Sequence, residues 1–335
     1  MTGTRLCVAA VQMRSEAGAV QANLARALPL VEEAASAGAR LILLPELMPG
    51  GYVFSPAIWD GAEPAQGLTV RWLKEHGRRL SVYLGTSFLE AEGEDFFNTF
   101  VLATPDGQEA GRVRKQTPAL FETCFTTGSE GPHTLETALG RIGVGICYEN
   151  QQLWFARLMG SRSIDLLLMP HSAPMPRATL FSRRKIRVLS ENLSTLAPHY
   201  AQLLGVPAVF CNKCGPFESP LPGWPFTPRP SSFPGLSTIA DSDGAVRAQL
   251  GAEEGVILAE VSLDPRRKKT PSLRRGHWLR KMPWGTSLFC GLVEAAGRSR
   301  YRRSTARRER ARAASSSSAR SPLPDHHTTH LRGSP

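Results

Sequence analysis

Apolar residues follow two different spacings along the first third of the chain, and together they predict strands separated by helices. Short apolar runs predict strands over residues 6–12, 41–44, 83–90 and 98–103, a hairpin turn predicts a further strand over 109–113, and a spacing of three to four residues predicts helices over residues 19–37 and 69–80. The run over residues 41–44 is continuous, as in a strand covered on both faces, and Pro45 ends it. Pro105-Asp106-Gly107 predicts a turn that joins the last two strands into a hairpin.

The same alternation continues through the second half of the chain. Strands are predicted over residues 142–146, 164–169, 206–211 and 256–261, a hairpin over 237–240 and 245–249, and helices over 152–161 and 179–204. Helices between strands indicate an α/β layered domain, and the hairpins indicate that its sheets are not purely parallel.

Two segments lack such a pattern. Residues 216–234 hold seven prolines in nineteen positions, so we expect a loop without regular structure there. A loop of this length is either a wall of a substrate pocket or a variable surface excursion. Residues 298–335, rich in serine and arginine, are typical of a basic, disordered tail. We therefore expect one domain over residues 1–297, with a C-terminal extension from about residue 266.

The basic charge of the chain is concentrated at its C-terminal end. Of the net charge of +11, residues 298–335 contribute +8, from ten Arg and two acidic residues, which leaves +3 for the other 297 positions. A nucleic-acid-binding body is therefore not expected. A second basic stretch over residues 266–281, interleaved with tryptophan, favours a solvated extension that packs on a neighbouring subunit over a nucleic-acid site.

Cellular location and membrane association follow from composition. With 41% apolar residues among 335, the chain can build a core, but no apolar run approaches the roughly 18 residues of a membrane span. The first residues do not resemble a signal peptide. Six cysteines without regular spacing do not form a disulfide framework, so we expect the reducing cytoplasm.

Three polar residues at the ends of strand-like runs point to acyl-transfer chemistry. Cys147 follows a glycine-rich strand and precedes a helix-like segment, where backbone N–H groups favour a thiolate. Glu46 directly follows a buried strand, and its desolvation suits a general base. Lys115 follows another strand and is a candidate to stabilise an oxyanion. Taken singly, each residue also suits a structural role, as an inert buried cysteine, a turn cap or a solvated lysine.

These residues lie in blocks that resemble a known family. The opening block holds Ala9-Ala10-Val11-Gln12-Met13, Gly38-Ala39-Arg40-Leu41, Pro45-Glu46-Leu47 and Gly51-Tyr52. Later blocks surround Lys115 (residues 114–118, with Glu122) and Cys147 (residues 143–149), and end with residues 208–215 and 233–239. In this order, over about residues 5–265, the blocks resemble the nitrilase, or carbon–nitrogen hydrolase, superfamily.

The resemblance implies an α-β-β-α sandwich that assembles into dimers or larger homo-oligomers. It implies Cys147 as the nucleophile, Glu46 as the general base, and Lys115 with the backbone N–H of Tyr148 as the oxyanion stabilisers. Glu122 matches the second glutamate of the family, which orients the lysine or the substrate. The implied reaction forms a thioester intermediate and needs no metal or organic cofactor.

The motifs leave the substrate open between an amide and a nitrile. Tyr148 directly after Cys147 is similar to amidases, whereas Glu149-Asn150 is similar to nitrilases. Thr117 also stands where family amidases commonly carry a histidine. We expect Tyr52, Trp154 and His171 to line the substrate pocket.

Two features of the chain also suit functions other than hydrolysis. The first is the basic tail, through which a binding protein that retains the fold without catalysis would engage a polyanion. The second is Cys211-Asn212-Lys213-Cys214, whose Cys-x-x-Cys spacing lacks the second cysteine or histidine pair that a zinc site needs. We therefore expect a small-molecule hydrolase without a metal.

Overall fold

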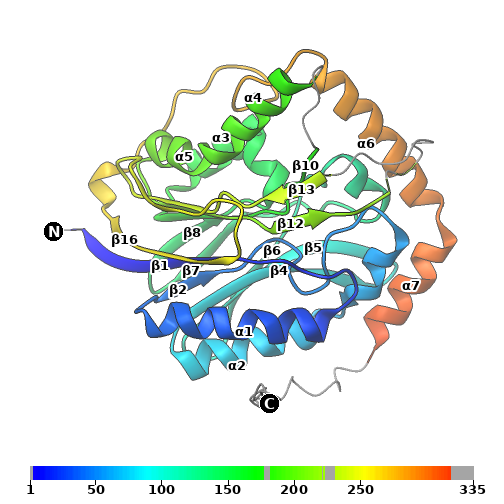
Figure 1. Ribbon diagram of the computed structural model, residues 1–335, viewed down its shortest axis with the longest axis horizontal. Helices are drawn as coiled ribbons and strands as arrows, with labels where there is room; N and C mark the ends of the chain where they lie inside the picture. Colours follow the sequence, from blue (N-terminus) through cyan, green and yellow to red (C-terminus); the bar gives the residue numbers. More distant parts are fainter. Residues whose placement is uncertain (1–2, 177–181, 221, 223–230, 318–335) are drawn as a thin grey trace, which may run out of the picture.

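The computed structural model describes residues 3–176, 182–220, 222 and 231–317, and it arranges them in four layers. Two sheets lie face to face in the middle, with helices on the outer face of each (Figure 1). This is the predicted α-β-β-α sandwich. The central strands β1, β2, β4, β5, β9, β11 and β16 and the helices α1, α2 and α3 lie within a few residues of the ranges that periodicity predicted.

The first sheet is built from the N-terminal half of the chain and closed by its last long strand. Its strands run in the order β16-β1-β2-β4-β5-β6, with β3 beside β4. Strands β1, β2 and β4 are parallel, whereas β16 joins β1 antiparallel and β4, β5 and β6 form an antiparallel meander. The bounds are β1 Thr4–Gln12, β2 Leu41–Leu43, β3 Ala62–Glu63, β4 Tyr83–Glu92, β5 Asp95–Ala103, β6 Glu109–Arg114 and β16 Gly255–Leu263.

The second sheet repeats this design with a parallel centre and antiparallel edges. Its order is β15-β14-β11-β9-β8-β7, in which β8, β9 and β11 are parallel. The bounds are β7 Thr134–Thr137, β8 Gly140–Val144, β9 Leu166–Pro170, β11 Ala208–Cys211, β14 Thr238–Ala240 and β15 Val246–Gln249.

Successive side chains along each strand face opposite sides of the sheet, which explains why the layers stack. In β1, Val8 and Ala10 face the core between the two sheets, while Ala9 and Val11 face the helices. The outer helices of the first sheet are α1 Val20–Ser36 and α2 Leu68–Leu80, and those of the second are α3 Leu153–Arg162, α4 Arg183–Ser194 and α5 Leu196–Leu204. Strands covered on both faces read as continuous apolar runs, which is the pattern that residues 41–44 show.

The single helix predicted over residues 179–204 is wrong, because the structure divides it into α4 and α5 at Thr195. Pro198 explains the break. Proline has no N–H to donate and fits only the first turn of a helix, so a new helix has to start just before it. Residues 179–181 lie outside the described part.

The proline-rich segment was expected to lack regular structure, and at its two ends this expectation is wrong. β12 Cys214–Phe217 pairs with β13 Ser231–Pro234, which also pairs with β10 Met175–Pro176 in a small third sheet. Pro216 is tolerated because it lies in an outer strand of this sheet, where its missing N–H costs no ladder bond. Residues 221 and 223–230, between these strands, are outside the description.

The basic tail was expected to be disordered from residue 298, and the structure differs as far as residue 317. Residues Thr286–Arg303 form α6, and Thr305–Ser316 form α7 along one side of the sandwich (Figure 1). Arg307 pairs with Asp95 at 2.7 Å and Arg310 with Asp60 at 2.8 Å. Composition alone misses this helix because its arginines are neutralised by carboxylates far away in sequence. Residues 318–335 lie outside the described part.

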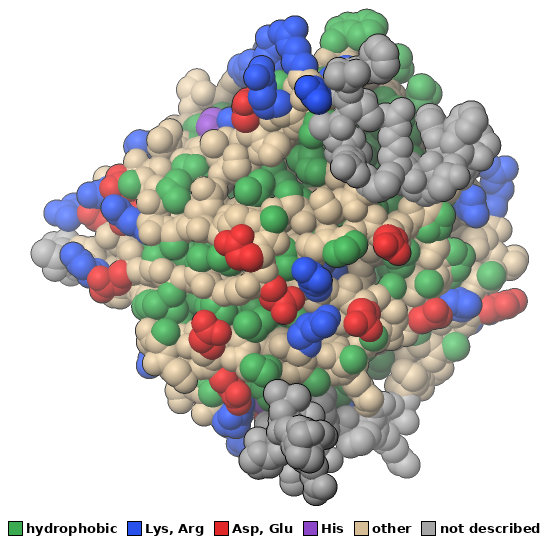
Figure 2. All heavy atoms as spheres, viewed as in Figure 1, with side chains coloured by type: hydrophobic (Ala, Val, Ile, Leu, Met, Phe, Trp, Pro, Cys, Tyr) green, Lys and Arg blue, Asp and Glu red, His purple; other side chains and the backbone are tan. Residues whose placement is uncertain are grey.

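The surface is consistent with a body of modest net charge. Across the middle of the face in Figure 2, Lys and Arg side chains are interspersed with Asp and Glu. Within the described residues, no helix has the length and apolar character needed to cross a bilayer.

Candidate active site

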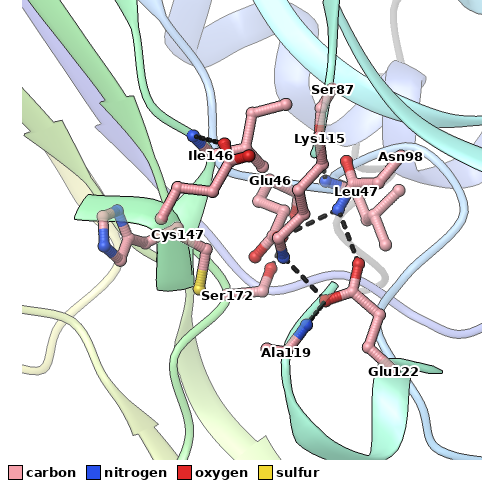
Figure 3. Close-up of polar contacts among 12 residues, drawn as sticks. Glu46, Leu47, Ser87, Asn98, Lys115, Ala119, Glu122, Ile146, Cys147 and Ser172 are labelled. Atoms are coloured by element: carbon pink, nitrogen blue, oxygen red, sulfur yellow. Dashed lines mark hydrogen bonds and ion pairs between the residues drawn. The ribbon is translucent and has the colours of Figure 1, made fainter. Parts of the chain in front are cut away.

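The fold brings together the three residues that sequence reasoning singled out. Glu46 follows β2, Lys115 follows β6 and Cys147 follows β8, so residues from both sheets meet at one end of the sandwich. Lys115 Nζ lies 2.7 Å from Glu46 Oε1, and both side chains are fully buried. The sulfur of Cys147 points toward this pair in Figure 3.

The turn that carries Glu46 is held from several sides. The Ser172 hydroxyl donates to the Glu46 carbonyl at 2.6 Å, and the Thr86 hydroxyl donates to the Pro45 carbonyl at 2.7 Å. Leu47 adopts a positive φ of 45°, which is unusual for a branched side chain, and its N–H donates to the Ser87 hydroxyl at 2.9 Å. These bonds fix a backbone conformation that would otherwise relax, and with it the direction of the carboxylate.

Cys147 sits at a strained elbow between β8 and a short 3₁₀ turn, Cys147–Gln151. Its φ of 54° lies in the left-handed region, and its side chain is only 5% exposed. The Asn150 amide braces the elbow by donating to the carbonyls of Gly145 at 2.6 Å and Cys147 at 3.2 Å. A Cβ at Gly145 would come within 2.1 Å of the Asn150 side-chain oxygen, so only glycine allows this packing.

Glu122 completes the buried charge cluster. It lies on the 3₁₀ turn Leu120–Cys124, and its Oε2 is 2.6 Å from Lys115 Nζ. The side-chain amide of Asn98 donates to both carboxylates, at 2.8 Å to Glu46 and 3.1 Å to Glu122. Two carboxylates and one ammonium therefore share a water-poor site, where their electrostatic interactions are strong.

Burial sets the protonation behaviour of the cluster. It raises the pKa of Glu46, an effect that Lys115 and the nearby Cys147 thiol oppose. Burial also raises the pKa of Cys147 well above 9, and the Glu46 charge raises it further. Burial alone would lower the pKa of Lys115, but the charges of Glu122 and Glu46 outweigh it and the net shift is upward. These shifts favour a protonated lysine and a neutral thiol, and they make Glu46 a stronger proton acceptor than an ordinary glutamate.

The three residues predicted to line the pocket fall in different places. The Tyr52 hydroxyl lies 3.4 Å from Glu122 Oε2, so this ring borders the cluster. His171 is fully buried beside the Glu46 turn, because its carbonyl accepts from the Glu46 N–H at 3.3 Å. Burial lowers the pKa of its imidazole to about 3, so the ring is neutral. Trp154 packs instead on His133, at 5.5 Å between centroids, and lines an outer hollow of about 630 Å³ whose described lining does not include Glu46, Lys115 or Cys147.

Sequence reasoning missed Asn98, Ser172 and the role of Glu149. One Glu149 oxygen accepts from the Gln116 N–H at 2.7 Å, and the other accepts from the Ile146 N–H at 3.0 Å. This carboxylate therefore ties the residue after Lys115 to the residue before Cys147. An acid two positions after Cys147, in an otherwise apolar stretch, was the only available signal; Asn98 lies in an ordinary strand pattern and gave none.

The Cys-x-x-Cys pair does not form a ligand cluster. Cys211 Sγ lies 3.2 Å from the Val11 carbonyl and 3.3 Å from the Leu43 carbonyl, and burial raises the pKa of its thiol. Among the residues with described positions, no group of three or more His, Cys, Asp and Glu side chains is placed to hold a metal ion.

The sequence and the fold of this chain are both similar to those of known proteins. Residues 7–268 match the model of a family described as carbon-nitrogen hydrolase. The chain is 26% identical to the omega-amidase NIT2 of Homo sapiens, over 82% of this chain and 93% of that protein. It is 30% identical to a nitrilase of Pyrococcus abyssi, over 51% of this chain and 66% of that protein. The crystal structure of a carbon-nitrogen hydrolase from Helicobacter pylori G27 shares the fold, with a TM-score of 0.67 and 21% identity over 79% of this chain and 91% of that one.

Proposed function

This chain belongs to the carbon–nitrogen hydrolase family, and on that premise we propose that it hydrolyses the amide bond of a small molecule through a thioester on Cys147. It is an enzyme of the amidase or nitrilase type, as its relatives are. The observation that carries the proposed mechanism is the fully buried Glu46–Lys115 ion pair, toward which the Cys147 sulfur points. Burying these charges is costly, and a mechanism that uses them explains why they are kept.

In the first half of the proposed reaction, Glu46 takes the thiol proton while Cys147 Sγ attacks the carbonyl carbon. The negative charge that develops on the carbonyl oxygen is stabilised by Lys115 Nζ and the backbone N–H of Tyr148. When the carbon–nitrogen bond breaks, protonated Glu46 returns its proton to the leaving nitrogen, and ammonia or an amine departs. A thioester on Cys147 remains.

In the second half, water attacks the thioester carbon and Glu46 accepts its proton. The same oxyanion donors stabilise the second tetrahedral species. The carbon–sulfur bond then breaks, the Cys147 thiolate takes the proton from Glu46, and a carboxylic acid is released. Glu122 serves in this scheme by fixing the Lys115 ammonium, with which it makes its 2.6 Å contact.

A nitrile is the second candidate substrate. The nitrilase relative and the Glu149-Asn150 pair after the cysteine region support it, whereas the omega-amidase relative and Tyr148 support the amide. The test is a screen for ammonia release from small amides, nitriles and carbamoyl compounds. We expect turnover in the amide set; turnover confined to nitriles would replace the amide proposal, and no release from any class would reject the hydrolase proposal.

The pH dependence of turnover follows from the raised pKa of Glu46. A base whose pKa is raised takes up its proton at a higher pH than usual, so activity is lost earlier as the solution is acidified. We expect the acid limb of kcat/KM to have its midpoint above the pKa of about 4.3 that an ordinary glutamate shows. Steady-state kinetics from acidic to neutral pH, with tryptophan fluorescence to confirm folding, measures it. A midpoint at or below the ordinary value would contradict the assignment of Glu46 as the base.

A cytoplasmic location and a homo-oligomeric state belong to the proposal. All six cysteines are free, which suits a reducing compartment. Large apolar side chains just before and within the first turns of α6 are exposed, including Trp284 at 96% and Leu288 at 70%, and they support contact with a second subunit. Trp278, expected to pack on a neighbour, instead contacts Tyr148 within the chain, at 5.7 Å between ring centroids.

The non-catalytic alternative is less well supported than hydrolysis. That reading needs the basic tail to be available for a polyanion, but Arg307, Arg310 and Arg312 of α7 already contact acidic residues of the sandwich. An α7 bound in this way neutralises the charge that would attract a polyanion.

A further inference from the structure

Helix α6 lies beyond the region that the family model matches, yet it packs on the candidate active site. The match ends at residue 268, and α6 spans Thr286–Arg303. Its inward face carries Cys290, Glu294, Gly297 and Tyr301, a spacing of three to four residues that places them on one side of a helix. This face contacts both 3₁₀ turns of the site, the one that carries Glu122 and the one that begins with Cys147.

The first contact joins α6 to the residue after Cys147. The Tyr148 hydroxyl donates to Glu294 Oε1 at 2.9 Å, and the Glu294 side chain is only 14% exposed. Burial raises the pKa of Tyr148, so its hydroxyl stays protonated and remains a donor. A hydrogen bond from a phenol to a carboxylate is strong enough to fix the ring. Since the ring is attached to the Cα of Tyr148, holding it in place limits how far the backbone of this residue, and with it the N–H, can move.

The second contact joins α6 to the turn of Glu122. A Cβ added to Gly297 would come within 2.0 Å of the Thr123 hydroxyl oxygen and 3.2 Å of the Cys124 backbone nitrogen. The helix backbone therefore touches the turn directly, which only glycine permits. The Thr123 hydroxyl is held in place by a hydrogen bond that it donates to the Leu120 carbonyl at 2.5 Å.

A third contact anchors the far end of the same face. The Tyr301 hydroxyl donates to Asp95 at 3.0 Å and accepts from the Phe96 N–H at 3.0 Å. Since β5, which begins at Asp95, also carries Asn98, this anchor fixes the helix to the strand that supplies the amide between the two carboxylates. The helix is therefore attached to three separate parts of the site.

We propose that α6 is a positioning element of the active site and that Glu294 is its positioning residue, acting through Tyr148 on the oxyanion-stabilising N–H. This inference rests on the proposed function, because the role of that N–H does. Glu294 touches no reacting atom in this scheme. Its effect is on the rate of the chemical step and not on substrate affinity, since the N–H is used in the transition state.

The first test is a double-mutant cycle on the Tyr148–Glu294 hydrogen bond. We expect Y148F, which removes the bond, to lower kcat about tenfold, and E294Q, whose amide oxygen can still accept the bond but carries no charge, to lower it less, each with KM within about twofold. Because both variants act on the same bond, the double variant should be no slower than Y148F alone. E309Q, which changes an exposed carboxylate on α7, should retain the wild-type kcat. Unchanged kcat in E294Q, or additive losses in the cycle, would overturn the proposal.

The second test uses two glycines of the same helix. Added to Gly291, a Cβ meets nothing within 4 Å, whereas added to Gly297 it meets the turn of Glu122. Alanine favours a helix over glycine, so G291A should raise the thermal unfolding temperature and leave kcat unchanged. G297A should lower kcat about tenfold, because the turn has to shift to make room. Equal kcat in the two variants would overturn the proposal.

A chemical readout separates failure of this inference from failure of the proposed function. Iodoacetamide modifies Cys147 without any substrate, and peptide mass spectrometry distinguishes this site from the other five cysteines. Cys147 is 5% exposed, so we expect E294Q and G297A to loosen its turn and raise its alkylation rate about threefold, while E309Q and G291A match the wild type. If the wild type turns over no substrate, these rates still test whether α6 and Glu294 position the Cys147 turn, and unchanged rates in E294Q and G297A would reject that role.

Discussion

A Cys147→Ala variant should lose ammonia release by at least about 10⁴-fold, because removal of a catalytic nucleophile leaves only binding and electrostatic effects to accelerate the reaction. The loss should appear in kcat, since the substrate still binds beside Glu46 and Lys115. Alanine fills most of the volume of the thiol and tolerates the elbow no worse than cysteine does. Steady-state rates with the best substrate from the screen measure the effect.

The control for this variant is Cys7→Ala, which removes a thiol from β1, outside the Glu46–Lys115 cluster. It should retain wild-type turnover, which excludes a general effect of cysteine loss. Circular dichroism and thermal unfolding of Cys147→Ala should show a folded protein, so that lost activity reports chemistry. Turnover above a hundredth of the wild-type rate in folded Cys147→Ala would mean that another group is the nucleophile.

The layered fold was predictable because its strands and helices differ in period. The run of residues 41–44 and the helix period of residues 69–80 each correspond to an observed element, β2 and α2. The break between α4 and α5 was missed because one proline in an otherwise helical pattern was not read as the start of a new helix. Helix α7 was missed for another reason. Its arginines pair with Asp60, Glu94 and Asp95, and such pairing across more than two hundred residues has no local signature.

Some residues of the site could be identified from the local sequence pattern, whereas others depend on contacts with residues far away in the sequence. Glu46 and Cys147 were identifiable because each polar side chain follows an apolar run, and Lys115 because it lies in a block that resembles the family motif. Asn98 was not identifiable, because a polar residue within a strand is ordinary and its two carboxylate partners come from other elements. Glu294 was also missed, since its partner Tyr148 lies 146 residues earlier in the chain. The sequence pattern shows which reactive side chains follow the end of a strand. It does not show which residues far away in the sequence contact these side chains and fix their positions.

Replacing Lys115 with methionine should both inactivate and destabilise the protein. The ammonium lies 2.7 Å from Glu46 and 2.6 Å from Glu122, and all three side chains are fully buried. Methionine keeps the length of the side chain but leaves two buried carboxylates without their counter-charge. Breaking a buried ion pair on one side costs about 3–5 kcal/mol, so the free energy of unfolding should fall by that amount at neutral pH. Turnover should become undetectable, because the proposed oxyanion donor is gone.

The pH dependence of this loss identifies its cause. Lys115 normally lowers the Glu46 pKa against the effect of burial, so in the variant this pKa rises further above its unfolded value. A carboxyl with a raised folded pKa contributes stability below its unfolded pKa and loses it as the pH rises through the folded pKa. Lys115→Met should therefore recover part of its stability at mildly acidic pH, which urea unfolding at two pH values measures.

Two further variants separate charge from packing in this prediction. Adding Glu122→Gln to Lys115→Met removes one of the two unpaired charges, so it should restore part of the stability but none of the activity. Lys213→Met is the matched control, because Lys213 is equally buried and donates to the Leu47 carbonyl, at 3.0 Å, and burial lowers its pKa to about 7. Since no carboxylate among the described residues forms an ion pair with Lys213, its loss should cost less than that of Lys115. An equal cost for the two lysines, or a Lys115→Met protein as stable as the wild type at neutral pH, would show that the ion pair does not hold the buried carboxylates in place.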